Sequence, residues 1–338
     1  MKKLMTTLAV MAAGTCAFAQ IPDQKPDFPL PEGVKMETFT FATREEGELK
    51  LDVYRDASFD GKDLPVFLYA YGGSWASGTR KDAPWIVRMA QHGMVGVCIE
   101  YRLRCKGKQI PAEAEFGAQY DEAIRAAVED IYSATRFLLD NEESLGIDRN
   151  RFVISGGSAG ATSVNMAEYW LVNEDPIAEG MPEGFNYAGV VSFAGGIWKY
   201  GTEDPVWKSK PCPYMFFHGN KDQLVPYARV TLQACDYGAF GPDVICPQLK
   251  EMEVPYHKYT SQEADHYMAG GPDYTASENP AAIDYTEQVF DFIDRVVILG
   301  EKVGIESSET VYGEPRTLEW AFKDLLAKMA EELKKQQQ

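Results

Sequence analysis

The chain has 338 residues, of which 51 are acidic and 33 basic, and its net charge is −18 with neutral histidines. This acidic balance argues against nucleic acid, anionic membrane surfaces and polyanionic substrates as partners. The length is sufficient for one large α/β domain with a substantial core.

The N-terminus has the pattern of a secretory signal peptide over residues 1–19. Lys2-Lys3 is followed by an apolar run over residues 4–13 and by an A-x-A cleavage site, Ala17-Phe18-Ala19. The run is too short to span a membrane, and no later stretch is long enough. We therefore expect a secreted or periplasmic protein without a membrane anchor, which starts at Gln20. Loss of Lys2 and Lys3 would change the net charge from −18 to −20.

Next in the chain is a short leader, followed by alternating strands and helices. Residues 20–35 are proline-rich and predict an extended segment, and residues 36–54 alternate apolar and polar side chains, which predicts an antiparallel hairpin. The later apolar runs alternate with helical stretches, which is typical of βαβ units in a parallel sheet. The expected strands are 65–71, 94–101, 151–155, 188–193, 213–218 and 253–259, and the helical stretches include 117–140, 161–171, 224–234 and 281–299.

This order predicts a single α/β catalytic domain over residues 36–300. Its central sheet should be mostly parallel, with an antiparallel N-terminal edge and helices on both faces. Residues 301–338 predict an amphipathic helical tail, which either docks on its own domain or joins two copies of the chain. The apolar face of this helix would consist of Leu318, Phe322, Leu325, Met329 and Leu333.

The strongest single motif is Gly156-Gly157-Ser158-Ala159-Gly160, between an expected strand and an expected helix. A G-x-S-x-G sequence in this position predicts a sharp turn that exposes a nucleophilic serine in a strained backbone conformation. The same turn places the Ala159 N–H at a helix start, where it can donate to an oxyanion. The alternative, a nucleotide-binding glycine loop, fits poorly because Ser158 stands where that motif needs glycine.

Two further residues complete a candidate triad. Asp222 follows the strand 213–218, and His266 follows the strand 253–259, so both lie where parallel strands end. The chain order Ser, Asp, His is the order of this architecture. Asp222 would otherwise be a helix N-cap, and His266 a surface-loop histidine without a role. Asp265 is a weaker candidate for the acid because it is adjacent to His266.

The other three histidines are less suitable as the base. His92 precedes the serine in the chain, His218 ends a strand where a structural role is expected, and His257 lies inside a strand. Without a C-x-x-C or H-E-x-x-H sequence, neither a zinc site nor any other metal or cofactor is expected. Five cysteines remain after residue 19, an odd number that requires at least one free thiol or an intermolecular bridge. A bridge between Cys235 and Cys246 stays open.

The fourth candidate element is Tyr71-Gly72-Gly73-Ser74-Trp75, directly after a strand. Glycines there free backbone N–H groups to point into a cavity and to form the other half of an oxyanion hole. Taken alone, the segment would be an ordinary strand-ending turn. Four nearby or later aromatic residues could line a substrate cleft or belong to the core: Trp75, Trp198, Tyr200 and Trp207.

From about Leu49 to Leu299 the chain resembles the α/β-hydrolase fold. Within that fold it looks like the secreted esterases related to the hormone-sensitive lipase group and to the feruloyl and acetylxylan esterases of polysaccharide-degrading bacteria. The matching segments are Leu51-Asp52-Val53-Tyr54, Tyr71 to Trp75, Glu100-Tyr101-Arg102-Leu103, Gly156 to Gly160, and His218 to Pro226. Tyr71 stands where the family normally has a supporting histidine, a departure that would affect efficiency more than reaction type.

The resemblance implies that the N–H groups of Gly73 and Ser74 join that of Ala159 in the oxyanion hole, and that Glu100 to Arg102 is structural. We expect acyl transfer through a Ser158-Asp222-His266 triad on a small-molecule or oligosaccharide ester, either a short-acyl (acetyl) or a feruloyl ester of carbohydrate. Two alternatives remain. One is a peptidase of the prolyl-oligopeptidase type, whose usual gating propeller has no room here, and the other is a non-catalytic ligand-binding member of the fold.

Overall fold

The computed structural model describes residues 28–61, 63–272 and 282–310. The expected signal peptide and the helix expected beyond residue 314 lie outside these residues. The strands are β1 Val34–Arg44, β2 Gly47–Asp56, β3 Leu64–Ala70, β4 Val95–Ile99, β5 Ile147–Gly157, β6 Gly189–Phe193, β7 Ile197–Tyr200, β8 Tyr214–Gly219, β9 Arg229–Leu232, β10 Tyr237–Phe240, β11 Tyr256–Gln262 and β12 Gly304–Thr310.

The helices alternate with these strands along most of the chain. The α-helices are α1 Val87–Gln91, α2 Glu113–Asp140, α3 Glu142–Leu145, α4 Ala159–Val172, α5 Pro242–Glu251 and α7 Ala282–Phe292, and a π-helical turn, Ile293–Ile298, continues α7. Short 3-10 helices cover Ala57–Phe59, Arg80–Asp82, Pro84–Ile86, Pro176–Ala178, Gln233–Cys235 and His266–Gly270.

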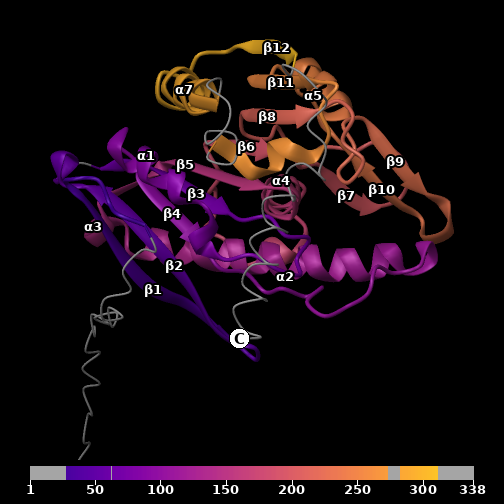
Figure 1. Cartoon of the computed structure of the whole chain (residues 1–338), viewed down its shortest axis with the longest axis horizontal. Helices are drawn as coiled ribbons and strands as arrows, with labels where there is room; N and C mark the ends of the chain where they lie inside the picture. The colour runs from indigo at the N-terminus through magenta and orange to yellow at the C-terminus, as the bar shows by residue number, and fades with distance from the viewer. Residues whose placement is uncertain (1–27, 62, 273–281, 311–338) are drawn as a thin grey trace, which may run out of the picture.

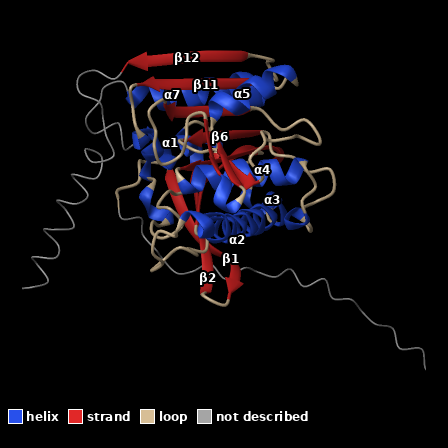
Figure 2. Cartoon of the chain, turned by 90° about the vertical axis from the view of Figure 1, so that its right-hand side faces the viewer, coloured by secondary structure: helices blue, strands red, loops and turns tan. Residues whose placement is uncertain are grey.

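The strands of the described residues form one large sheet and one small sheet. The large sheet has the order β1-β2-β4-β3-β5-β6-β8-β11-β12. The pairs β1–β2 and β2–β4 are antiparallel, and every later pair is parallel. In Figure 2 the β1–β2 hairpin and the β11–β12 pair lie at opposite edges of a strongly twisted sheet. The predicted fold class is therefore confirmed.

Helices cover both faces of this sheet. In Figure 1, α1 and α7 lie on one face and α2 and α4 on the other. Arg88 of α1 bonds to Thr286 of the neighbouring α7, and His92, at the C-terminal end of α1, bonds to Asp294 in the π-helical turn after α7. The central strands β3 and β6 are mostly apolar and every residue in them is buried, because helices exclude water from both sides.

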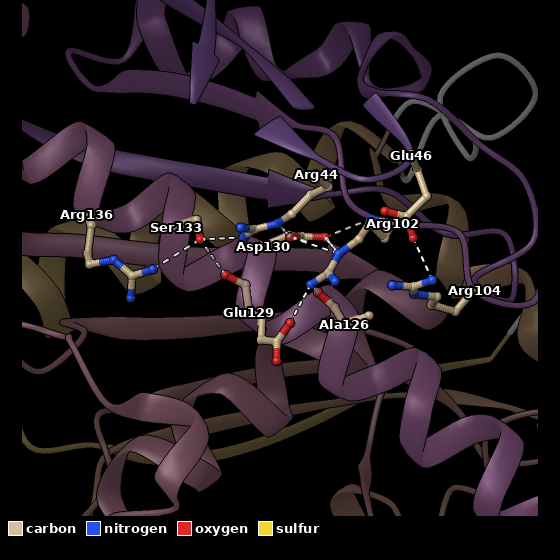
Figure 3. A network of polar contacts seen from close by, with 9 residues as sticks. All are labelled: Arg44, Glu46, Arg102, Arg104, Ala126, Glu129, Asp130, Ser133 and Arg136. Atoms are coloured by element: carbon tan, nitrogen blue, oxygen red, sulfur yellow. Dashed lines mark hydrogen bonds and ion pairs between the residues drawn. The ribbon is translucent and has the colours of Figure 1, made fainter. Parts of the chain in front are cut away.

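A buried ion network attaches the N-terminal hairpin to α2 (Figure 3). The carboxylate of Asp130, which is fully buried in α2, accepts hydrogen bonds from the Nε atoms of Arg44 at 2.9 Å and Arg102 at 2.9 Å. The backbone N–H of Arg102 donates to the same carboxylate. Arg44 belongs to the end of β1, and Arg102 follows β4, so one side chain connects three segments far apart in the sequence.

Two predictions about secondary structure are wrong. Residues 224–234 were expected to be helical, but the chain makes a turn there and then forms β9, which pairs with β10 in the small sheet β7-β10-β9. The expected tail from residue 301 begins instead with β12, which pairs parallel with β11 and extends the domain to residue 310. Tertiary pairing overrides local helix propensity in both segments.

Candidate active site

Ser158 lies at the turn between β5 and α4. Its backbone has φ +52° and ψ −117°, a conformation that L residues rarely adopt, so the predicted strain is confirmed. A side chain on Gly156 would lie 2.4 Å from the Gly160 carbonyl carbon, and one on Gly160 would lie 2.1 Å from the Ala70 oxygen. Only glycine fits at these two positions, and the resulting close contacts hold the serine at the end of the sheet.

The structure brings Ser158, His266 and Asp222 into one hydrogen-bonded chain. The distance from Ser158 Oγ to His266 Nε2 is 2.8 Å, and from His266 Nδ1 to Asp222 Oδ2 it is 2.6 Å. The carboxylate of Asp222 can only accept a hydrogen bond, so His266 carries its proton on Nδ1. Its Nε2 is then free to accept the proton of Ser158. His266 and Asp222 are buried, whereas Ser158 is partly exposed to solvent.

Asp222 is held as a carboxylate by its surroundings. Its Oδ1 accepts the backbone N–H groups of Leu224 at 2.9 Å and Val225 at 3.0 Å, so the side chain closes the loop after β8 rather than capping a helix. Burial alone would raise the pKa of this carboxyl. The hydrogen bonds from His218 and His266 outweigh burial and place the pKa of Asp222 well below its ordinary value.

The other histidines contact residues away from Ser158. His92 lies 3.1 Å from Asp294 and stacks on Phe290, and His257 lies 2.7 Å from Ser307 Oγ. His218 does not contact Ser158 Oγ; its Nε2 lies 3.3 Å from Oδ2 of Asp222. Asp265 accepts the backbone N–H of its neighbour His266 and that of Gln223, so its carboxylate is engaged with the main chain.

The segment predicted to form the second half of the oxyanion hole has an unusual backbone. Gly73, Ser74 and Trp75 have φ values of +120°, +54° and +55°. Ser74 and Ala159 line the same cavity as Ser158, whereas Gly73 is not among its described lining residues. The Ala159 N–H is the first of α4 and has no partner within the helix. Ser74 and Ala159 thus lie at the cavity beside Ser158, where the sequence predicts oxyanion donors.

Tyr71, the residue before this segment, is fixed by contacts with Tyr101. Its ring is buried and stacks on Tyr101, with 4.5 Å between ring centroids and 22° between planes. The Tyr101 hydroxyl donates to the Tyr71 carbonyl oxygen at 2.7 Å. Glu100 accepts the Lys50 N–H and pairs with Arg80, and Arg102 binds Asp130, so the Glu100 to Arg102 segment is bonded to its surroundings at each residue.

A cavity of about 500 Å³ opens beside Ser158. Trp75 and Trp198, two of the four aromatic residues considered from the sequence, line it, whereas Trp207 packs on Tyr169 and donates to Gln248. The rest of the lining was not predicted from the sequence. It comes from one face of the first turns of α2, from the loop that carries Asp222 and from the small sheet. These residues include Ile110, Glu113, Phe116, Tyr120, Leu224, Val230, Leu232 and Tyr237. The spacing 113, 116, 120 is the helical signal that could have shown part of it.

All five cysteines of the described residues are free thiols, including Cys235 and Cys246. The described residues contain no group of three or more His, Cys, Asp or Glu side chains that could hold a metal ion. None of the helices in the described segments has the length and apolar character needed to cross a bilayer.

Comparison with known proteins places this site in a recognised fold. The BD-FAE family model matches residues 51–197. Esterase B1 of Culex pipiens is 31% identical over 132 residues, which cover 38% of this chain and 23% of that protein. Esterase LipC of Mycobacterium tuberculosis is 29% identical over 157 residues, 46% of this chain and 34% of that protein. The chain thus spans about a quarter to a third of the length of these curated relatives.

Solved structures resemble the chain over most of its length. Esterase B of Lactobacillus rhamnosis superposes with a TM-score of 0.57 at 15% identity, covering 81% of this chain and 91% of that one. The propionate-bound esterase Est2 of Thermogutta terrifontis superposes with a TM-score of 0.58 at 20% identity, covering 81% and 98%. The fold is the α/β-hydrolase fold.

Proposed function

We propose that the protein is a serine carboxylic ester hydrolase. The observation that carries the proposal is the chain of contacts from Ser158 Oγ through His266 to Asp222, at 2.8 and 2.6 Å, at the edge of a cavity. A serine, a histidine and a buried carboxylate in this order are the components of acyl transfer through a covalent intermediate.

The steps follow from the positions of the atoms. His266 Nε2 takes the Ser158 proton while Oγ attacks the ester carbonyl, and the N–H groups of Ala159, Ser74 and Gly73 are the proposed donors to the oxyanion. His266 then gives that proton to the leaving alcohol as the C–O bond breaks. Water attacks the acyl-enzyme, His266 takes its proton and returns it to Ser158 Oγ, and the carboxylic acid leaves. Asp222 orients His266 and stabilises its imidazolium form.

The structural neighbours support the same chemistry. Est2 of Thermogutta terrifontis has been solved phosphonylated by cyclosarin and phosphorylated by paraoxon, at TM-scores of 0.54 and 0.55 to this chain. Organophosphorus compounds of this kind react with an activated nucleophile. We infer that Ser158 has the same reactivity here.

For the substrate, we propose short-acyl or feruloyl esters of a carbohydrate or another polar alcohol. The cavity supports the aromatic alternative, because its volume of about 500 Å³ is well above the roughly 150 Å³ that accommodates benzene. Phe116, Tyr120, Trp198 and Tyr237 offer ring faces and edges to an aryl group. An acetyl group would fill only a small part of this space.

A panel of esters tests both the reaction and the substrate class. We expect kcat/KM for nitrophenyl acetate and for a feruloyl ester to exceed that for nitrophenyl palmitate. A maximum at octanoyl or longer chains would contradict the proposed substrate class but not the reaction. Absence of hydrolysis of every ester, with cleavage of peptides instead, would contradict the reaction itself.

We also propose that the protein is secreted or periplasmic, from the signal pattern in residues 1–19. Determining the N-terminal residue of the mature protein tests this, and the expected residue is Gln20. Self-association through the C-terminal helix expected beyond residue 314 is a separate proposal, which comparison of the molar mass in solution with and without residues 315–338 would test.

A further inference from the structure

His218 occupies a position that the catalytic mechanism does not use. It lies in β8, four residues before Asp222, and its side chain is completely buried. Its Nε2 atom lies 2.9 Å from the carbonyl oxygen of Val225 and 3.3 Å from Oδ2 of Asp222. A carbonyl oxygen only accepts hydrogen bonds, so Nε2 carries the proton and His218 is the donor to both groups.

All the polar contacts of the His218 ring are made by one of its two nitrogens. Among the described residues, Nδ1 is buried without a hydrogen-bond partner. Both contacts of the ring therefore pass through Nε2–H, and both lead to the loop that carries Asp222. Buried polar atoms are normally hydrogen-bonded, so the unpaired Nδ1 is a cost of placing a histidine here. The contacts made by Nε2–H are what this position gains in return.

The contacts of Asp222 show what this donor adds. Oδ1 accepts two N–H groups of the acid's own loop, from Leu224 and Val225, whereas Oδ2 accepts His266 Nδ1 and faces His218 Nε2. His218 is the contact that comes from the central sheet rather than from a loop. Its bond to the Val225 carbonyl holds the far end of the same loop, which no α-helix follows.

We propose that His218 is a positioning residue for the catalytic acid, fixing the Asp222 carboxylate so that Oδ2 points at His266 Nδ1. The proposal rests on the proposed function for its effect on rate, and on geometry alone for its effect on Asp222. A donor on Oδ2 restricts rotation of the carboxylate about its Cβ–Cγ bond and shares its negative charge. Small displacements of aligned catalytic groups cost large factors in rate, so a modest change in this alignment should be measurable.

The test compares three variants with the parent. His218→Phe keeps a buried ring but removes the donor, and His218→Gln replaces the ring while its amide nitrogen can reach the position of Nε2. His257→Phe is the matched control, because His257 is also buried in a strand but bonds to Ser307. Active sites are counted by titration with a phosphonate so that kcat refers to folded enzyme.

We expect His218→Phe to lower kcat about tenfold or more with a smaller change in KM. The pH at which kcat/KM is half-maximal should rise, because a carboxylate that loses a donor attracts the charged form of the base more strongly. His218→Gln should restore kcat to within about threefold of the parent, and His257→Phe should leave kcat and the midpoint unchanged. Equal kcat and midpoint in His218→Phe and the parent, or equal impairment of both His218 variants, would overturn the proposal.

A second measurement separates this proposal from the proposed function. The proton shared by His266 Nδ1 and Asp222 should give a far-downfield NMR signal, which His218→Phe should shift or broaden and His218→Gln should retain. A parent without ester hydrolysis whose signal behaves in this way would contradict the function and support the positioning role. An active parent whose signal is the same in all variants would contradict the positioning role alone.

Discussion

At the scale of single residues, two carboxylates, Asp222 and Asp265, lie near His266, and their contacts distinguish them. The carboxylate of Asp222 reaches the imidazole at 2.6 Å, whereas that of Asp265 accepts main-chain N–H groups. An acid that orients a histidine must contact the ring, and only Asp222 of the two does so.

Replacement of Asp222 by Asn should therefore lower kcat by about 10³ to 10⁴, because the amide no longer stabilises the required tautomer and the imidazolium form. Asp265→Asn is the matched control and should retain kcat within about tenfold. Steady-state kinetics on nitrophenyl acetate, with circular dichroism to verify folding, make the comparison. Equal losses in the two variants would exclude Asp222 as the specific partner of His266.

Motif order and strand ends were sufficient to predict that Ser158, Asp222 and His266 lie together, because covalent order and parallel topology restrict where such groups can meet. The contacts of His218 with Asp222 could not be predicted, since sequence shows a histidine at a strand end but not the direction of its ring. The cavity lining was missed for a similar reason: Val230 and Leu232 belong to β9, where the local pattern favoured a helix.

At the scale of elements, the segment Gly72 to Trp75, which carries proposed oxyanion donors, is positioned by residues at the ends of β3 and β4. The Tyr71–Tyr101 stack and the hydrogen bond from the Tyr101 hydroxyl fix the residue that precedes Gly72 and Gly73. Tyr71, the residue that stands where the sequence resemblance implied a histidine, is thus part of a buried aromatic pair.

Tyr101→Phe should keep the stack but leave the Tyr71 carbonyl unpaired, which destabilises the fold by about 1–3 kcal/mol. We also expect kcat to fall about tenfold through displacement of the oxyanion donors. Tyr132→Phe is the control, because its buried hydroxyl donates to the carbonyl oxygen of Ala167, a residue of α4, at 2.6 Å. It should lose similar stability without losing kcat, and a parallel loss of kcat in both variants would argue against a specific role for Tyr101.

The helix that carries Ala159 also contains a buried acid, Glu168. Burial, only partly offset by a hydrogen bond from the Cys212 N–H, raises the pKa of Glu168 from 4.5 to about 7, and its Oε2 has no partner among the described residues. The unfolded chain releases this proton near pH 4.5, whereas the folded protein keeps it until about pH 7. Stability contributed by this group is therefore full below pH 4.5 and lost as the pH rises to 7.

Over that interval the loss should amount to about 3 kcal/mol, and the contribution should stay constant above it. Glu168→Gln should remove this part of the pH dependence, as measured by urea unfolding from pH 4 to pH 8. Glu179→Gln is the control. Glu179 is exposed and follows α4 in the chain, so this substitution should leave the curve unchanged. A Glu168→Gln curve parallel to that of the parent would contradict the assignment.

At the scale of the whole molecule, the alternation of apolar runs and helical stretches predicted the parallel sheet. The polar contacts of Asp130, which attach the N-terminal hairpin to α2, could be found only in the structure. Figure 3 shows the Asp130 network beside the more exposed pair Glu46–Arg104. No periodicity identifies Asp130 as buried, because the same helix has charged residues on its solvent face. The edge strand β12 was likewise not predictable, since its sequence, Gly304–Thr310, is mostly polar and contains no apolar run.

Asp130→Asn should destabilise the fold by about 3–5 kcal/mol, because two guanidinium groups lose their buried counter-charge. Glu46→Gln should cost less than about 1 kcal/mol, since its pair with Arg104 is exposed. Chemical denaturation of the two variants measures both values. Similar small losses would show that the network does not anchor the hairpin.

The central claim, that Ser158 is an activated nucleophile, is tested most directly by reaction with a fluorophosphonate and identification of the modified residue by mass spectrometry. We predict a single adduct on Ser158 in the folded parent, loss of labelling in Ser158→Ala, and strongly reduced labelling in His266→Ala. Absence of labelling in the folded parent, or an adduct on a different serine that persists in Ser158→Ala, would contradict the account.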